Sequence, residues 1–141
     1  MSPKFFDRNK RIISEFRENH GTVTTAQFGR RLVLLHHVGA RSGKPMVTPV
    51  MHVRKNPDTW YVAASKGGAP SNPSWFYNLL AHPDIDIETP DDGTVPVHVT
   101  QLHGAQRDDA YAQFKAMSPG FIQYEQNTTR TIPVLQLTRR G

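Results

Sequence analysis

The sequence predicts an α+β domain in which about six short strands form a small antiparallel barrel and roughly three helices pack against it. Six segments are short and apolar or alternate apolar with polar residues, and turn-forming residues separate most of them, as in consecutive hairpins. Three other segments carry apolar residues at helical spacing. The segments do not alternate regularly as strand, helix, strand, which argues against a parallel sheet. With 141 residues, the chain fits one domain, so we assign residues 1–141 to a single unit.

Composition restricts the classes of function. Apolar residues make up 37% and charged residues 21% of the chain, which is typical of a globular protein. The absence of cysteine excludes disulfides, thiolate metal sites and a cysteine nucleophile, and it suits a cytoplasmic protein. No apolar run approaches the length of a membrane-spanning helix. The net charge of +5 favours an anionic partner, but the basic residues are dispersed, so we do not expect a nucleic-acid-binding protein.

The first element that we expect is an amphipathic helix over residues 5–19, within an N-terminal segment 1–20. Phe5, Ile12 and Phe16 share one face, and two further apolar residues lie beside them. The polar face is mildly basic. Such a helix usually packs on its own domain, but it can also cover a substrate channel or touch an anionic membrane. Peripheral contact with the inner face of the membrane is therefore an open alternative.

Two strands joined by a glycine-rich loop follow this helix. Residues 32–38 and 46–53 have the apolar, β-branched content of strands. The link at residues 39–45 reads Gly-Ala-Arg-Ser-Gly-Lys-Pro and places two basic side chains at the tip of a hairpin. Pro49 removes a backbone donor from the second strand, so this strand is predicted to lie at an edge or to carry a bulge.

The stretch from Ala63 to Ala81 is the strongest local candidate for a binding site. A short strand at residues 60–64 precedes it, and a helix with Asn72 as predicted N-cap and Pro73 at its first position follows. Between them lies Ser-Lys-Gly-Gly, where glycines permit unusual backbone geometry and free amides would suit an anion or a ring of polar acceptors. A plain strand-to-helix connection with a surface lysine is the alternative.

The C-terminal part predicts three further strands and one helix. Residues 85–99 read as a hairpin, because alternating apolar residues flank a Pro-Asp-Asp-Gly turn. Residues 110–117 carry apolar side chains at helical spacing, and Ser-Pro-Gly at 118–120 ends that helix. Residues 132–138 form the last strand.

The side chains alone offer little machinery for catalysis. His36 and His37 are adjacent on a strand and so point to opposite faces, and no acidic residue accompanies His36 and His52 at ligand spacing, so we expect no metal site. A nucleophile elbow, a phosphate loop and a dinucleotide fingerprint are all missing. The acidic pairs at 91–92 and 108–109 lie where a turn and a helix start need them. A bound cofactor could supply the missing reactivity.

Several motifs, in the same order along the chain, resemble the deazaflavin-dependent nitroreductase family. They are Gly39-Ala-Arg-Ser-Gly-Lys-Pro45, Val47-Thr-Pro49, Ala64-Ser-Lys-Gly-Gly-Ala-Pro70, Asn72-Pro-Ser-Trp75 with Asn78-Leu79, and Thr129-Arg-Thr-Ile-Pro133. The resemblance covers nearly the whole chain. It implies a split β-barrel that binds the deazaflavin coenzyme F420 and passes its hydride to an electron-poor small molecule, such as a quinone, a nitroaromatic or a conjugated carbonyl compound.

The resemblance also implies which residues surround the coenzyme. Arg41, with Ser42, is expected at the phosphate end, and we add Lys44 because it lies beside Arg41 in the loop. The ring is expected between the strand near residues 46–51 and the segment at 63–67, with the start of the next helix closing the pocket. The predicted coenzyme contacts are Ala40, Arg41, Ser42, Lys44, Met46, Val47, Thr48, Pro49, Val50, Met51, Ala63, Ala64, Ser65, Lys66, Gly67, Ser74, Trp75, Phe76, Tyr77 and Asn78.

The sequence departs from the family pattern in two places. Met46 stands where a second basic residue is frequent, which puts affinity for the coenzyme's tail in doubt. Most tyrosines that line the acceptor site of the best-known member are replaced, so reduction of bicyclic nitro compounds is not assumed; the replacing residues are Met51, Ser118 and Phe121. The remaining Tyr124 is the candidate proton donor or acceptor-orienting group, with Ser65 as the second catalytic candidate. An ordinary, partly buried aromatic residue is the alternative for Tyr124.

Two other functions stay open at the level of sequence. One is a flavin-mononucleotide-dependent oxidoreductase of the same barrel class, and the other is a carrier that binds a deazaflavin or a lipid-like ligand without chemistry. The sequence names neither the physiological acceptor nor the oligomeric state.

Overall fold

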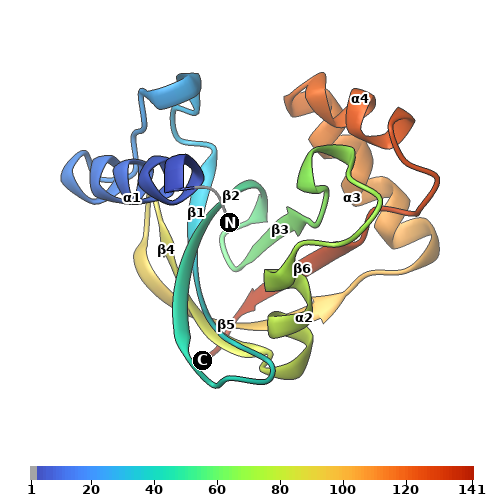
Figure 1. The fold of residues 1–141 in the computed structure, drawn as a ribbon. Coiled ribbons are helices and arrows are strands. Elements are labelled where there is room, and N and C mark those ends of the chain that lie inside the picture. The colour runs from blue at the N-terminus through green and yellow to red at the C-terminus, as the bar shows by residue number, and fades with distance from the viewer. Residues whose placement is uncertain (1–2) are drawn as a thin grey trace.

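A computed structural model describes the backbone of residues 3–141 and the side chains of residues 8–141 (Figure 1). Six antiparallel strands form a closed barrel in the order β1-β2-β3-β6-β5-β4. These strands are β1 (Leu32–Val38), β2 (Pro45–Asn56), β3 (Thr59–Ala63), β4 (Asp84–Thr89), β5 (Gly93–Gln101) and β6 (Val134–Arg139). The predicted fold class, an antiparallel barrel with packed helices, is confirmed.

Helices cover the outside of the barrel and close one of its ends (Figure 1). In the described residues they are α1 (Pro3–Glu18), α2 (Ser74–Ala81), α3 (Gly104–Met117) and α4 (Gly120–Gln126), with short 3-10 helices η1 (Thr25–Gln27) and η2 (Lys66–Gly68). The sequence did not predict α4. Ser118 does end α3, but Pro119 then takes the N-cap position of a new helix, because the helix that follows needs no N–H from it.

The barrel interior is filled by inward-facing strand residues and by one face of α2. Val33, Leu35 and Trp60 are almost completely buried there, and they contact Trp75 and Leu79 of α2. Burial of such side chains is the main favourable term in folding. The helix α2 is therefore fixed by the core, and its exposed face can serve as a rigid wall for a site.

The helix α1 packs on the outer face of the barrel. Ile12 and Phe16 are 3% and 4% exposed and join a cluster with Leu32 and Leu34 of β1. The predicted apolar stripe of α1 is thus used inside the domain. The contribution of Phe5 to this stripe lies outside the described side chains.

The strand β2 has two strand neighbours along only part of its length. Residues 45–51 pair with β1, whereas pairing with β3 begins at His52. Pro49 lies in the stretch with a single neighbour, which confirms its predicted edge position; the register shift lies farther on, between Arg54 and Asn56. Within the described chain, the side of residues 45–51 that faces away from β1 has no strand partner, so its backbone groups can bind a ligand.

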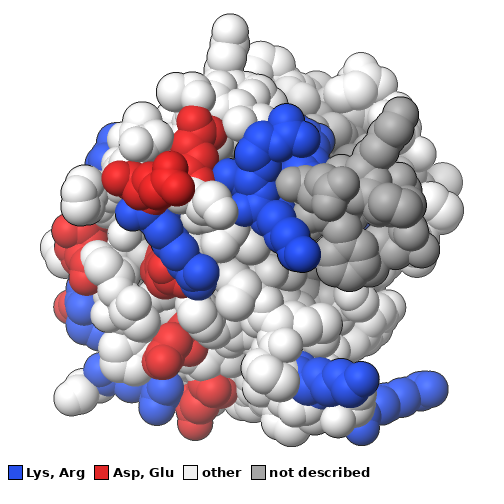
Figure 2. All heavy atoms as spheres, turned by 60° about the vertical axis from the view of Figure 1, so that its left-hand side comes forward, with Lys and Arg blue, Asp and Glu red and all other residues white. Residues whose placement is uncertain are grey.

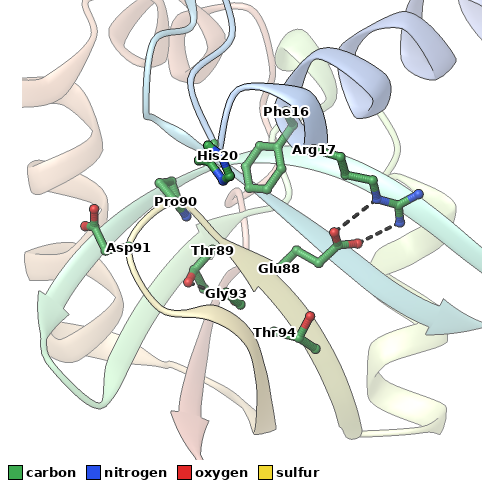
Figure 3. A pocket seen from close by; sticks show the side chains of 10 residues that line it. Phe16, Arg17, His20, Glu88, Thr89, Pro90, Asp91, Gly93 and Thr94 are labelled. Atoms are coloured by element: carbon green, nitrogen blue, oxygen red, sulfur yellow. Dashed lines mark hydrogen bonds and ion pairs between the residues drawn. The ribbon is translucent and has the colours of Figure 1, made fainter.

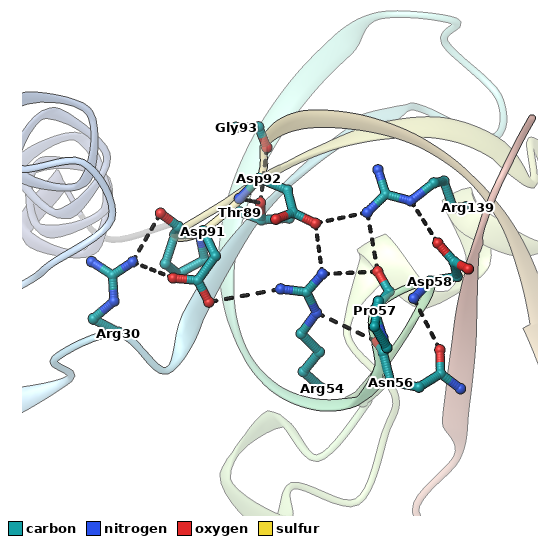
Figure 4. Close-up of polar contacts among 11 residues, drawn as sticks. Arg30, Arg54, Asn56, Pro57, Asp58, Thr89, Asp91, Asp92, Gly93 and Arg139 are labelled. Carbon is teal, nitrogen blue, oxygen red and sulfur yellow. Dashed lines mark hydrogen bonds and ion pairs between the residues drawn. The ribbon is translucent and has the colours of Figure 1, made fainter.

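The acidic pair in the β4–β5 turn is held by arginines from β2, from β6 and from the segment before β1 (Figure 4). Arg54 and Arg139 donate to Asp92 Oδ2 at 2.6 and 2.7 Å, and Arg30 donates to Asp91 Oδ1 at 2.6 Å. Hydrogen bonds from Arg139 and Arg54 lower the pKa of the Asp92 carboxyl group. Asp91 and Asp92 therefore serve the structure of the turn, as predicted.

Candidate active site

A cavity of about 680 Å3 lies between the β1–β2 loop, the start of β2 and the helix α2. The residues that line it are Gly39, Ala40, Arg41, Ser42, Met46, Ser74, Tyr77 and Asn78. All of them except Gly39 belong to the predicted set of coenzyme contacts. The structure thus brings together two predicted segments that are about 30 residues apart in the sequence.

The β1–β2 loop is closed by its own backbone and presents two cations. Gly39 N–H donates to Lys44 O at 2.9 Å, and Gly43 N–H donates back to Gly39 O at 3.0 Å. A Cβ atom on Gly39 would lie 2.3 Å from Ser42 Oγ, so a larger residue there would force the Ser42 hydroxyl to turn away from its present position. The side chains of Arg41 and Lys44 are exposed and form no ion pair with any described residue, so both charges are available to an anion.

A partly buried chain of hydrogen bonds connects this loop to α2 and β2. The backbone N–H of Ala40 donates to Asn78 Oδ1 at 2.9 Å, which turns the amide NH2 of Asn78 toward His37 Nδ1 at 3.0 Å. His37 Nε2 lies 2.8 Å from Thr48 Oγ1. Burial, assisted by the neighbouring His36, lowers the pKa of His37, so its ring is neutral and Nδ1 can accept the Asn78 hydrogen. Asn78 thus positions the walls of the cavity.

The segment after β3 forms a backbone nest for a negatively charged or polar group. Ser65 has right-handed helical angles (φ −76°, ψ −39°), and Lys66 has φ +48°. A right-handed residue followed by a left-handed one turns successive N–H groups toward a common point. The N–H groups of Ser65, Lys66 and Gly67 donate to no other group in the described chain. The predicted ring-binding segment therefore has free, convergent donors.

Arg130 binds the backbone carbonyls of the nest segment. It was not predicted as a site residue. Its guanidinium donates to Ala64 O at 3.1 Å, Ser65 O at 2.9 Å and Ala69 O at 2.9 Å, and to Asn72 Oδ1 at 2.6 Å. The predicted N-cap role of Asn72 is wrong, because Pro73 takes the N-cap position and the Asn72 amide serves Arg130 instead. An arginine in the closing Thr-Arg-Thr-Ile-Pro motif was the only signal in the sequence, and it does not reveal a contact this distant in the chain.

The remaining predicted contacts divide between the faces of β2 and the core. Val47 and Met51 pack beside α1 on the outer face of the barrel, whereas Val50 packs with the interior. Trp75 and Phe76 are 9% and 5% exposed within the barrel core, so they support the site mainly from beneath. Four others lie around the nest or on the β2 stretch with one strand neighbour: Pro49, Ala63, Ala64 and Lys66.

Tyr124 lies on α4, away from the residues that line the cavity. Its ring packs edge-on against Phe121 with centroids 5.3 Å apart. Its backbone carbonyl lies close to Gly68: a Cβ atom added to Gly68 would lie 2.8 Å from Tyr124 O. Tyr124 therefore supports the η2 segment through its main chain, and its predicted catalytic role, like that of Ser65, stays a prediction.

His36, His37 and His52 are not arranged as a set of metal ligands. His36 and His37 point to opposite faces as predicted, because His36 Nε2 contacts Glu88 at 2.6 Å while His37 faces Thr48. His36 pairs with Val47 on β2, five positions from His52, so these two rings are not neighbours. Among the described residues, no group of three potential ligands could hold a metal ion.

A second cavity, of about 430 Å3, lies between the C-terminal end of α1 and the β4–β5 turn (Figure 3). Arg17 spans it with two hydrogen bonds to Glu88, at 3.0 and 2.7 Å. These bonds lower the pKa of Glu88. None of the residues that line this cavity belongs to the predicted site. Its acidic groups already form ion pairs, Glu88 with Arg17 and Asp91 with Arg30.

Comparison with known proteins gives consistent matches along the chain. A family model described as F420H(2)-dependent quinone reductase matches residues 9–139. An F420H(2)-dependent quinone reductase of Mycobacterium tuberculosis (strain ATCC 25618 / H37Rv) is 33% identical over 128 residues, 83% of each chain. The solved F420-H2 dependent reductase FDR-A is 33% identical with a TM-score of 0.69, over 77% of this chain and 94% of that one. A chain described as a domain-swapped dimer is 29% identical with a TM-score of 0.71, over 96% of this chain and 99% of that one.

The closed barrel and these matches define a split-barrel oxidoreductase. The chain belongs to the F420H(2)-dependent quinone reductase family. The predicted family resemblance, the enzyme class and coenzyme F420 as the cofactor are therefore confirmed.

Proposed function

We propose that coenzyme F420 binds across both parts of the site, with its ring at the nest of residues 65–67 and its phosphate and tail at the loop of residues 39–44. The observation that carries this proposal is the cavity between the loop and α2, the helix that follows the nest in the chain. The free N–H groups of the nest fit the polar edge of a deazaflavin ring, and Arg41 and Lys44 fit a phosphate and carboxylates. Met46 is exposed and adds no charge, so the loop supplies these two cations alone.

When bound, the reduced deazaflavin supplies a hydride to an electron-poor carbon of a quinone. The protein's part in this reaction is to bind, orient and exclude water. The nest donors are fixed by Arg130 and need no rearrangement when charge develops on a ring they contact. Fixing two reactants in one orientation also removes much of the entropic cost of their encounter. No side chain has to form a covalent bond.

A binding titration tests this function against its alternatives. Purified protein is titrated separately with coenzyme F420 and with flavin mononucleotide, while the fluorescence of Trp60 and Trp75 is followed. We expect a saturable response to F420, and oxidation of the reduced complex when menadione is added. Tight binding of flavin mononucleotide without a response to F420 would overturn the proposal. Binding of F420H2 without oxidation by any of a varied set of quinones would instead indicate a carrier.

The Arg41→Ala variant should bind coenzyme F420 about 10- to 150-fold more weakly. The substitution removes a charge-assisted hydrogen bond to the phosphate, which is worth about 1.5–3 kcal/mol. The turnover rate at saturating coenzyme should barely change, because this contact is the same before and after hydride transfer. The dissociation constant and single-turnover rates at saturation check both statements.

Lys44→Ala is the matched control within the same loop. It should weaken binding less than Arg41→Ala, because an exposed lysine that faces a flexible carboxylate tail is screened by salt. Both effects should shrink for a coenzyme analogue without phosphate and tail. If the binding curve of Arg41→Ala overlays that of the natural protein, the phosphate lies elsewhere, and Lys66 is then the next residue to substitute.

We also propose a weak peripheral contact between α1 and anionic membranes, where quinones reside. No helix in the described part of the chain has the length and apolarity to cross a bilayer. Arg8, Lys10 and Arg11 are exposed on α1, and Figure 2 shows basic and acidic side chains interspersed on this side of the molecule. Because Ile12 and Phe16 face the barrel, the contact would be mainly electrostatic.

Liposome flotation tests the membrane contact. We expect part of the protein to float with anionic vesicles at roughly 10 mM salt and to remain soluble at roughly 500 mM, since salt screens exposed charges. Vesicles of neutral lipid are the control. If all the protein stays in the soluble fraction at low salt, the membrane proposal is wrong, while the enzymatic one is unaffected.

A further inference from the structure

Arg130 is connected to the same peptide groups that form the nest. Its guanidinium donates to the carbonyls of Ala64 and Ser65, and the N–H groups of those two peptide bonds belong to Ser65 and Lys66. In a trans peptide the C=O and N–H bonds point in opposite directions. The free N–H groups therefore point away from Arg130, toward the side where the proposed function places the coenzyme ring.

The charge of Arg130 is not neutralised by an acidic partner. Its hydrogen-bond acceptors are three backbone carbonyls and one amide, and among the described residues no carboxylate forms an ion pair with it. Burial lowers the pKa of Arg130, but a guanidinium stays protonated in proteins. A positive charge at the carbonyl end of a peptide group polarises it and makes its N–H a stronger donor.

The backbone at this point needs such an anchor. Lys66 is held at φ +48°, a left-handed conformation that is unfavourable for a residue with a side chain. Without Arg130, the carbonyls of Ala64 and Ser65 would be free to turn, and the N–H groups would no longer converge. Arg130 thus acts on the ligand only through the nest, which makes it a positioning residue.

We propose that Arg130 both fixes the nest and, through its uncompensated charge, selects the negatively charged form of the coenzyme's deazaflavin ring over the neutral form. This inference rests on the proposed function, because it places the ring at residues 65–67. It adds a role that the neutral backbone donors alone would not supply. The hydroxylated deazaflavin ring loses a proton to give a delocalised anion, so the preference is measurable as a property of the bound ligand.

Two variants separate the charge from the hydrogen bonds. Arg130→Lys keeps the charge but makes fewer hydrogen bonds, whereas Arg130→Gln can still donate to the carbonyls of Ala64 or Ser65 but is neutral. The absorption spectrum of bound oxidised F420 is titrated with pH to give the pKa of the ring in each complex. Dissociation constants and melting temperatures are recorded alongside.

We expect the ring pKa to be lower in the complex with the natural protein than in solution. It should rise by roughly half a unit to one unit in Arg130→Gln, equivalent to a three- to tenfold loss of preference for the anion. In Arg130→Lys it should stay near the natural value, although affinity falls. Equal ring pKa values in the natural protein and in Arg130→Gln would overturn the role of the charge.

The outcomes also separate this inference from the proposed function. If the natural protein does not bind F420, the proposed function fails. If it binds F420 and Arg41→Ala weakens binding, but the ring pKa is insensitive to residue 130, only the inference about Arg130 fails. Should Arg130→Gln melt too early to be titrated, the natural protein and Arg130→Lys supply the comparison: a ring pKa in these two complexes that is no lower than in solution contradicts the proposal.

Discussion

The Gly68→Ala variant should lose about 2–5 kcal/mol of unfolding free energy. Gly68 has φ +82°, which costs a residue with a Cβ atom about 1–2 kcal/mol. A Cβ atom there would lie 2.8 Å from Tyr124 O and 2.9 Å from Asn127 Cβ, so α4 or the nest must move. Overpacking of this kind adds about 1–3 kcal/mol. Urea denaturation, with the midpoint and slope reported separately, measures the loss.

Gly67→Ala is the matched control one position earlier. Gly67 also has a positive φ, +64°, but a Cβ atom there would meet no atom within 4 Å. The control should therefore show the backbone cost alone, about 1–2 kcal/mol. Equal losses in the two variants would mean that the packing of α4 against η2 contributes nothing. Because Gly68 lies at the end of the nest, its substitution should also weaken binding of F420 more than Gly67→Ala does.

Local patterns in the sequence predicted most of the barrel. The strand β1 was predicted with its observed bounds, and the β4–β5 hairpin followed from alternation around Pro-Asp-Asp-Gly, since both signals depend on neighbouring residues only. The helix α4 was missed because its seven residues have little stability of their own. It forms because Phe121 is buried against α3 and because Gly68 lets the nest approach it.

Site residues that belong to a sequence motif could be predicted, whereas those whose role depends on contacts distant in the chain could not. The loop with Arg41 and the start of α2 were identified from the family resemblance, and the structure places them around one cavity. Arg130 was not, because its role depends on carbonyls that lie 61 to 66 residues away. His37 was considered only as a possible metal ligand, since its partner Asn78 is 41 residues away.

The Asn78→Leu variant should lose about 2–4 kcal/mol of unfolding free energy and bind F420 about tenfold or more weakly. Leucine has a similar volume but leaves the partly buried Ala40 N–H and the buried His37 Nδ1 without their partners. Each unsatisfied buried group costs about 1–3 kcal/mol. The β1–β2 loop would then no longer be fixed to α2, so the position of Arg41 is lost as well. Urea denaturation and F420 titration measure the two effects.

The Asn78→Asp variant tests the direction of the hydrogen bonds. In the natural protein, burial holds the pKa of His37 below 6.5. As the pH falls below about 6.5, the unfolded chain therefore binds more protons at this histidine than the folded chain does. The free energy of unfolding decreases as a result, so this histidine's contribution to stability is lost on acidification. A carboxylate at position 78 cannot donate to His37 Nδ1, but it accepts a hydrogen bond from the protonated ring and so raises its pKa. The stabilisation by this hydrogen bond in Asn78→Asp is present at low pH, and it is lost as the pH rises through the raised pKa of His37.

The unfolding free energies of the natural protein and of Asn78→Asp should therefore converge as the pH falls from about 8 to 5. The difference between the two proteins isolates position 78, because His52, whose pKa burial lowers to about 4, titrates in both. His36, the neighbour that also lowers the pKa of His37, contacts Glu88 and is unchanged by the substitution. Parallel pH profiles would show that Asn78 does not donate to His37, and the hydrogen-bonded connection from Ala40 to Thr48 would then have to be assigned differently.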